Sequence, residues 1–256
     1  MTNQNNYAVV ILAAGKGKRM KNPDLPKVLV QLDGQELLGH VLDMTSRLNP
    51  SRNVVVAGHF KEKVIDFARG TYPELNVEFV IQAEQLGTGH AVDMARGELA
   101  DFSGEVLILA GDVPLLSAET IQKFIEYHYS NNHDCSVLST KAPDPTGYGR
   151  IVRDESGDFQ RIVEQKDATE EEKQIDEINS GVYFVDARLL FDSLKNVSNE
   201  NAQGEYYLTD IVAILKANGK SVGAFSGANY DELLGINSPE QLQVAKKVLA
   251  RMKNNS

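Results

Sequence analysis

The sequence predicts an α/β fold built on a mostly parallel sheet. Short apolar runs alternate with segments of helical apolar spacing through the first half of the chain, an order that forms parallel sheets with right-handed crossovers. From residue 135 onwards, strands separated by turns replace the long helices, which predicts a smaller antiparallel or mixed portion. The 256 residues can bury a large core, and we see no linker, repeat or low-complexity tract, so we expect one continuous domain.

The elements of the first half follow in order. The apolar run at 8–14 is typical of a fully buried strand, and apolar side chains at helical spacing predict a helix over 36–48. The same reasoning predicts the remaining elements. They are strands at 53–57, 77–82 and 106–110 and helices at 60–68 and 89–96.

In the second half, turn residues separate the predicted strands. A short polar helix is expected after Thr169, which is a typical N-cap residue. Near the end, Ser238 predicts a helix start, with Pro239 at the first position and Gln241 completing a capping box. The expected strands are 135–140, 149–153, 159–164 and 177–186.

Composition excludes several classes of function. The net charge of −10 and the pI of about 5.0 argue against a nucleic-acid-binding surface. The single cysteine, Cys135, can form neither an internal disulfide nor a multi-cysteine metal site, and we expect it to pack as a small apolar side chain. Without a signal-peptide pattern or an apolar run of membrane-spanning length, we expect a cytoplasmic protein that binds no membrane.

Positive charge gathers in the loop after the first strand. Gly15 and Gly17 allow the backbone to bring N–H groups close to an anion. The loop is neither a dinucleotide fingerprint, because Met20 replaces the third glycine, nor a Walker loop. Because open α/β sheets bind ligands at the carboxyl ends of strands, we predict a phosphate site here, and a solvated basic turn is the alternative. The basic residues are Lys16, Lys18, Arg19, Lys21 and Lys27.

A carboxylate follows the predicted strand at 106–110. Asp112 comes directly after Gly111, which allows a close approach of the backbone. Mg²⁺ prefers oxygen ligands and keeps few protein ones, so Asp112 is a candidate magnesium ligand, and Asn237 could supply a second oxygen. A turn aspartate is the alternative for Asp112, and nothing in the sequence by itself pairs it with Asn237.

The loop at 82–89 lies between a predicted strand and a predicted helix. Its side-chain amides and backbone groups could read a nucleobase edge. The alternative is a loop that only starts a helix, with Thr88 as the cap. The five histidines show no metal-binding spacing, so we assign them no metal.

Several separated motifs occur together between Tyr7 and about Glu240. They are Leu12–Gly17, Arg19–Met20, Leu25–Lys27, Gln82–His90, Gly111–Asp112, Pro145–Ile151, Ile162–Glu164, Lys166–Thr169, Glu177–Gly181 and Asn201–Tyr207. In this combination the chain resembles the sugar-nucleotide pyrophosphorylases, and specifically the uridyltransferase domain of the bacterial bifunctional N-acetylglucosamine-1-phosphate uridyltransferases/glucosamine-1-phosphate acetyltransferases.

The resemblance implies a Rossmann-like nucleotidyltransferase fold, with a mixed, mostly parallel sheet flanked by helices and a smaller antiparallel sugar-binding portion. It implies that UTP and N-acetylglucosamine 1-phosphate form UDP-N-acetylglucosamine and pyrophosphate by Mg²⁺-dependent, in-line attack on the α-phosphorus. The implied roles are nucleotide binding for Leu12, Ala13, Ala14, Gly15, Gln82, Gly87, Thr88 and Gly111, phosphate contact in catalysis for Arg19 and Lys27, Mg²⁺ binding for Asp112 and Asn237, and sugar binding for Gly149, Glu164 and Asn179.

The resemblance also implies how the chain divides. We expect 1–134 to bind the nucleotide, 135–236 to bind the sugar and 237–256 to form a C-terminal helix. The hexapeptide repeats of a left-handed β-helix are absent from this sequence, so we expect neither acetyl transfer nor a trimer built through that half, and the oligomeric state stays open. The alternative functions are a related enzyme for another sugar 1-phosphate, and a non-catalytic regulatory protein that binds UDP-sugars.

Overall fold

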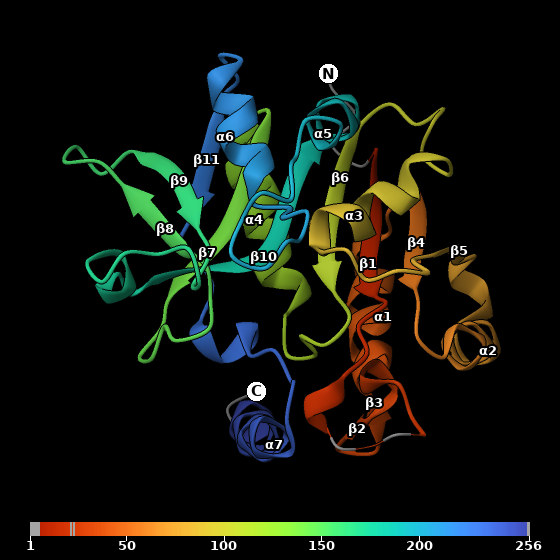
Figure 1. Ribbon diagram of the computed structural model, residues 1–256. Coiled ribbons are helices and arrows are strands. Elements are labelled where there is room, and N and C mark those ends of the chain that lie inside the picture. Colours follow the sequence, from red (N-terminus) through yellow and green to blue (C-terminus); the bar gives the residue numbers. More distant parts are fainter. Residues whose placement is uncertain (1–5, 21, 23, 255–256) are drawn as a thin grey trace.

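A mixed sheet forms the centre of the molecule (Figure 1). The computed structural model describes residues 6–20, 22 and 24–254, and only the backbone of Lys18. Within these residues the sheet has nine strands in the order β11-β7-β10-β6-β1-β4-β5, and β8 and β9 extend from β10. The predicted α/β class and the mixed, mostly parallel sheet are confirmed. Strands of both predicted binding portions share this sheet, and the division into portions stays a prediction.

The first half of the chain supplies four parallel strands. They are β1 (Tyr7–Ala13), β4 (Arg52–Ala57), β5 (Glu78–Ile81) and β6 (Glu105–Ala110). β1 pairs in parallel with both β4 and β6, and β4 pairs with β5. Helices cover both faces, so these strands are continuous apolar runs, and the predicted strands of this half match them closely.

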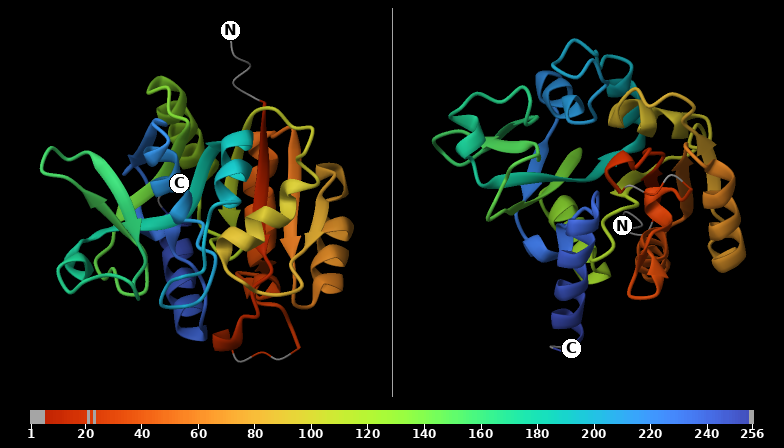
Figure 2. Two further views of the ribbon diagram at one scale, coloured as in Figure 1. Left: turned by 45° about the horizontal axis from the view of Figure 1, so that its top comes forward. Right: turned by 60° about the horizontal axis from the view of Figure 1, so that its bottom comes forward.

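The second half supplies the antiparallel portion, as predicted. Its strands are β7 (Cys135–Lys141), β8 (Arg150–Arg153), β9 (Phe159–Val163), β10 (Glu177–Asp186) and β11 (Val222–Phe225). β10 runs antiparallel to β6 and β7, β8 and β9 form an antiparallel pair, and β11 runs parallel to β7. Figure 2 shows the β8–β9 pair projecting from one side of the molecule. Cys135 is fully buried in β7, as expected.

Two layers of helices cover the sheet because successive residues of each strand point to opposite faces. In β1, Ala8 and Val10 pack in one core cluster, and Val9, Ile11 and Ala13 pack in the other. The first cluster includes α3 (Thr88–Asp93), α5 (Ala187–Leu194) and α6 (Asp210–Ala217), and the second includes α1 (Leu37–Leu48), α2 (Lys61–Thr71) and α4 (Ala118–Ser130).

The C-terminal helix α7 (Pro239–Asn254) packs on the hairpin formed by β2 (Gln31–Leu32) and β3 (Gln35–Glu36). Figures 1 and 2 show α7 beside this hairpin and the loop that follows β1. A third cluster joins these segments through Met20, Leu32, Leu37, Leu115, Ile236, Ala245 and Val248. The packing places Asn237, at the start of α7, near the carboxyl ends of β1 and β6.

Two helices of the structure, α4 and α5, were not expected from the sequence. Both have ordinary start residues: Ser117 accepts a hydrogen bond from Thr120 N at 3.1 Å, and Asp186 accepts one from Leu189 N at 2.8 Å. N-caps of this kind are readable in a sequence. No helix within the described ranges is long and apolar enough to cross a bilayer.

Two predicted helix starts differ in detail. Thr169 does cap a turn, but the helix behind it is a single 3₁₀ turn at Glu172–Gln174. Ser238 caps α7, but Gln241 Oε1 accepts a hydrogen bond from the Asn237 N–H at 2.8 Å, one residue before the expected donor. This bond fixes the backbone of Asn237 immediately before the helix.

Candidate active site

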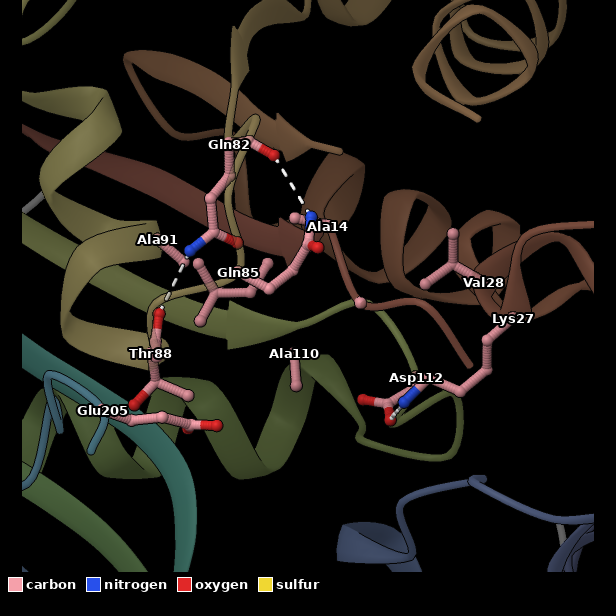
Figure 3. A pocket seen from close by; sticks show the side chains of 13 residues that line it. Ala14, Lys27, Val28, Gln82, Gln85, Thr88, Ala91, Ala110, Asp112 and Glu205 are labelled. Atoms are coloured by element: carbon pink, nitrogen blue, oxygen red, sulfur yellow. Dashed lines mark hydrogen bonds and ion pairs between the residues drawn. The ribbon is translucent and has the colours of Figure 1, made fainter. Parts of the chain in front are cut away.

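A cleft lies at the carboxyl ends of β1 and β6, where ligands of open α/β sheets bind (Figure 3). Its volume is about 290 Å³. Side chains from segments far apart in the sequence line it. The lining residues are Leu12, Ala14, Gly15, Lys27, Val28, Gln82, Gln85, Gly87, Thr88, Ala91, Ala110, Asp112 and Glu205.

Lys27 joins the two predicted metal ligands. Its Nζ forms an ion pair with the carboxylate of Asp112 and donates a hydrogen bond to Oδ1 of Asn237 at 2.7 Å. Figure 3 shows the Lys27 and Asp112 side chains pointing toward each other. The N–H of Ile236 donates to the carbonyl of Asp112 at 2.9 Å, which holds the two segments together. Gly17 is needed beside them, because a Cβ there would lie 2.7 Å from Cβ of Lys27.

The Lys27 cluster fits a magnesium site. Oxygens of Asp112 and Asn237 already converge on one cation, the Lys27 ammonium, and hard oxygen donors are what Mg²⁺ prefers. Among the described residues, no group of three or more His, Cys, Asp or Glu side chains could hold a metal. A magnesium ion at this cluster would take its other ligands from water and substrate phosphates, as Mg²⁺ usually does.

The 82–89 loop and the segment around Tyr206 are docked together. Gly87 has a φ of +114°, and a Cβ there would lie 2.5 Å from the carbonyl oxygen of Tyr206. The N–H of Gly89 donates to the same oxygen at 2.8 Å. Both the positive φ and the close approach therefore require glycine at position 87.

Thr88 is not the helix cap that one interpretation of the sequence expected. α3 begins at Thr88 and its N-cap is Gly87. The hydroxyl of Thr88 accepts a hydrogen bond from Leu208 N at 3.1 Å. Thr88 therefore fixes the neighbouring segment, and this contact brings Glu205 to the wall of the cleft.

Gln82 uses its side-chain amide within the loop. It is buried, and Nε2 donates to the Gly87 carbonyl at 3.1 Å and lies 3.0 Å from Nδ1 of His90. Gln85 Nε2 donates to the Gln82 carbonyl at 3.3 Å (Figure 3). Gln82, which was predicted to bind the nucleotide, therefore lines the cleft. Its side-chain amide holds the loop in shape.

The three predicted sugar-binding residues lie together. A Cβ built on Gly149 would lie 3.5 Å from both Asn179 Cβ and Glu164 Oε1. The N–H of Asn179 donates to the carbonyl of Gly149 at 2.8 Å, and its Nδ2 donates to the hydroxyl of Tyr183 at 2.9 Å. The three residues come from different strands or strand ends, so only the sheet topology brings them into contact.

Glu164 lies in an acidic environment. Burial raises the pKa of its carboxyl group, although the hydroxyl of Thr209, a hydrogen-bond donor at 3.3 Å, acts in the opposite direction. Burial also raises the pKa of Asp210 nearby. An adjoining cavity of about 260 Å³ is lined by Ile162, Val163, Glu164, Asp167, Glu200, Asn201, Tyr207, Thr209 and Asp210.

Of the residues predicted to bind the nucleotide or its phosphates, three lie outside the wall of the cleft. Arg19 is exposed on the 3₁₀ turn Lys18–Met20. Ala13 packs on the opposite face of the sheet, because alternate residues of β1 point to opposite sides. The N–H of Gly111 donates to the carbonyl of Leu12 at 3.0 Å, so this glycine contributes to the backbone of the site.

The other basic residues of the loop are separate from Lys27. Lys16 lines a neighbouring cavity with His59 and Phe60. Lys21 and the side chain of Lys18 lie outside the described residues. Whether any of them contacts phosphate stays a prediction.

Five of the lining residues were not named individually among the predicted site residues. Gln85 lies in the predicted loop and Glu205 in a motif of the resemblance, so both could have been found there. The apolar lining residues belong to no recognisable motif, and they are of types that usually form the hydrophobic core. The five residues are Val28, Gln85, Ala91, Ala110 and Glu205.

The chain is similar to known proteins over almost its whole length. It is 47% identical over 251 residues to the Bifunctional protein GlmU of Streptococcus mutans, covering 98% of this chain and 53% of that protein. It is 46% identical over 250 residues to the Bifunctional protein GlmU of Lactococcus lactis subsp. lactis, with the same coverage of 98% and 53%. The chain therefore spans about half the length of the curated relatives it matches.

A solved structure shares the fold. The crystal structure of HddC from Yersinia pseudotuberculosis complexed with GMP-PN superimposes with a TM-score of 0.69 at 23% identity, covering 95% of this chain and 99% of that one. Residues 9–179 match the family described as the MobA-like NTP transferase domain. This range contains β1, the loop that follows it, and Asp112. The chain belongs to the MobA-like NTP transferase domain family and is a nucleotidyltransferase.

Proposed function

We propose that the chain is a uridyltransferase that joins UTP and N-acetylglucosamine 1-phosphate into UDP-N-acetylglucosamine and releases pyrophosphate. The observation that carries this proposal is the convergence of Lys27, Asp112 and Asn237 at the cleft. The similarity to GlmU proteins over 98% of the chain supports it. The cluster formed by Gly149, Glu164 and Asn179 offers a second set of polar groups for the sugar.

In the proposed reaction the protein positions the two substrates and neutralises the charge of their phosphates. An oxygen of the sugar phosphate attacks the α-phosphorus of UTP in line, the bond from that phosphorus to the bridging oxygen breaks, and pyrophosphate leaves. Negative charge on the phosphate oxygens is stabilised by Lys27, and Arg19 is a second candidate on the same loop. Asp112 and Asn237 would hold Mg²⁺, which neutralises further phosphate charge when bound.

The remaining proposed contacts divide between the nucleoside and the sugar. The backbone from Leu12 to Gly15, together with Gln82, Gly87 and Thr88, faces the nucleoside. Glu164 accepts hydrogen bonds from sugar hydroxyls, and Asn179 orients the ring. Both substrates are small molecules.

The experiment is direct. Purified protein is incubated with UTP, N-acetylglucosamine 1-phosphate and Mg²⁺, and pyrophosphate and UDP-N-acetylglucosamine are quantified. The Asp112→Ala variant is the matched control, because it removes a predicted metal ligand from a partly buried surface position. A wild-type protein that releases no pyrophosphate with Mg²⁺ or Mn²⁺ contradicts the proposal.

A substrate panel separates the close alternatives. One small group on a substrate changes selectivity by only about 10- to 200-fold in an apolar pocket, so other sugar 1-phosphates and other nucleoside triphosphates are compared by kcat/KM. A different best pair would revise the substrate and leave the class intact. Binding of UDP-sugars without turnover of any substrate pair would favour the alternative of a non-catalytic regulatory protein. The combination of Lys27, Asp112 and Asn237 argues against that alternative.

A further inference from the structure

Arg150 is a buried charge without an ion-pair partner, although the charge of Asp144 acts on its guanidinium. It is the largest fully buried side chain of the described residues, with 1% of its surface exposed. Within the part of the chain that the structure describes, no carboxylate lies within ion-pair distance of its guanidinium. Burial lowers the pKa of the Arg150 guanidinium. Arginine is rarely buried unless it is paired, so a specific use of its donors is expected here.

The two terminal nitrogens of Arg150 donate to neutral oxygens of three segments, whereas its buried Nε has no hydrogen-bond partner. One terminal nitrogen donates to the carbonyl of Tyr148, and the other donates to Oε1 of Gln165 at 2.8 Å and to the carbonyl of Lys173 at 3.4 Å. Oε1 of Gln165 also accepts a hydrogen bond from the N–H of Gly147 at 3.1 Å. Arg150 and Gln165 therefore tie the turn before β8 to the end of β9 and to the 3₁₀ turn at Glu172–Gln174.

These tied positions are next in sequence to predicted sugar-binding residues. Tyr148 precedes Gly149, and Gln165 follows Glu164. Arg150 itself follows Gly149 in the chain, and side chains of neighbouring extended residues point to opposite sides. A Cβ on Gly149 would be directed at Glu164 and Asn179, so Arg150 holds the same backbone from the other side.

We propose that Arg150 is a positioning residue for the sugar 1-phosphate: it fixes Gly149 and Glu164 through Tyr148 and Gln165 without touching the substrate. This inference rests on the proposed function. Each of the three neutral acceptors belongs to a different segment, so one guanidinium holds all three segments together. Arginine has five donors in a rigid plane, whereas the ammonium of lysine is a single point charge, so lysine cannot hold the three segments in the same geometry.

The test separates the two substrates. In Arg150→Met and Arg150→Lys, kcat/KM for the sugar 1-phosphate is expected to fall roughly 10- to 100-fold, the size of effect that a displacement of about 1 Å produces at a reacting centre. KM for UTP is expected to stay as in the wild type. A merely structural role would lower the amount of folded protein and leave both KM values alone.

Arg153 is the matched control on the same strand. It pairs with Glu177 at 2.7 Å and reaches the carbonyls of Gly157 and Ala224, away from Gly149 and Glu164. Arg153→Met should lower the melting temperature and leave KM for the sugar 1-phosphate unchanged. If Arg153→Met raises this KM as much as Arg150→Met, or if Arg150→Met raises both KM values equally, the positioning role is overturned.

A second variant tests the proposal if Arg150→Met does not fold. Gln165→Leu keeps the buried guanidinium and removes one acceptor at a partly exposed position, so a folded protein with a raised sugar 1-phosphate KM supports the proposal and an unchanged KM overturns it. A wild-type chain without turnover contradicts the proposed function instead. In that event calorimetry decides: Arg150→Met must weaken UDP-N-acetylglucosamine binding and leave UTP binding intact, and equal effects on both overturn the positioning role.

Discussion

Nζ of Lys27 lies 2.7 Å from Oδ1 of Asn237, a residue 210 positions later in the chain. The same ammonium pairs with Asp112. One cation thus holds together the loop after β1, the end of β6 and the start of α7. The predicted phosphate-binding loop and the predicted metal ligands therefore meet in one cluster, and variants of Lys27 test both predictions.

Replacing Lys27 should remove most of the turnover. Lys27→Met is expected to lower kcat roughly 10²- to 10³-fold, because a preorganised cationic donor to the phosphate oxygens is lost. Steady-state pyrophosphate release measures the change. Lys16→Met is the matched control, since Lys16 lies in the same loop but lines a different cavity. Equal losses in the two variants would mean that Lys27 has no special role.

Metal binding can be followed without turnover. Because the Lys27 ammonium lies between the oxygens of Asp112 and Asn237, it competes with a divalent cation for them in the absence of nucleotide. Lys27→Met should then bind Mn²⁺ about tenfold more tightly, the equivalent of one charge-assisted hydrogen bond. Electron paramagnetic resonance counts the bound ion. Asp112→Ala should bind none at this cluster, and retention of Mn²⁺ by this variant would place the metal elsewhere.

Gly87 tests the docking of the 82–89 loop. Alanine at a φ of +114°, with its Cβ 2.5 Å from the Tyr206 carbonyl oxygen, should cost on the order of 1–3 kcal/mol of unfolding free energy and weaken nucleotide binding. Denaturant unfolding and calorimetry with UTP measure the two effects. Gly70→Ala is the control, because this helical position is open and alanine should stabilise it by about 0.5–1 kcal/mol. A Gly87→Ala protein with wild-type affinity would show that the loop does not serve the nucleotide.

The raised pKa of Glu164 predicts a pH effect on stability. The folded state favours the protonated carboxyl more than the unfolded state does, so the contribution of this group falls as pH rises from the usual glutamate pKa through the raised one. Glu164→Gln should therefore have a higher melting temperature than the wild type at neutral pH. The difference should shrink as the pH falls toward the usual glutamate value. The variant should also bind the sugar 1-phosphate more weakly, a trade of function against stability. A melting temperature below that of the wild type at neutral pH would contradict this prediction.

Local sequence patterns were sufficient for much of the fold. Buried parallel strands are continuous apolar runs, so β1, β4 and β6 could be located closely. Helices α4 and α5 were missed although they begin at ordinary capping residues, Ser117 and Asp186. The loop after β1 was predicted to bind an anion from its glycines and its charge, which are local features.

By itself the sequence determined the order of strands and loops, the glycine and lysine chemistry after β1, and the position of Asp112 at a strand end. The tertiary structure alone decided which of those residues meet. Lys27 and Asp112 are 85 residues apart, and they meet because β1 and β6 are neighbours in the sheet. Asn237 reaches them because α7 packs on the β2–β3 hairpin. Local propensities describe neighbours in sequence, whereas the sheet order and the helix packing fix neighbours in space, so Lys27 lines the cleft while Arg19 on the same loop lies outside its wall.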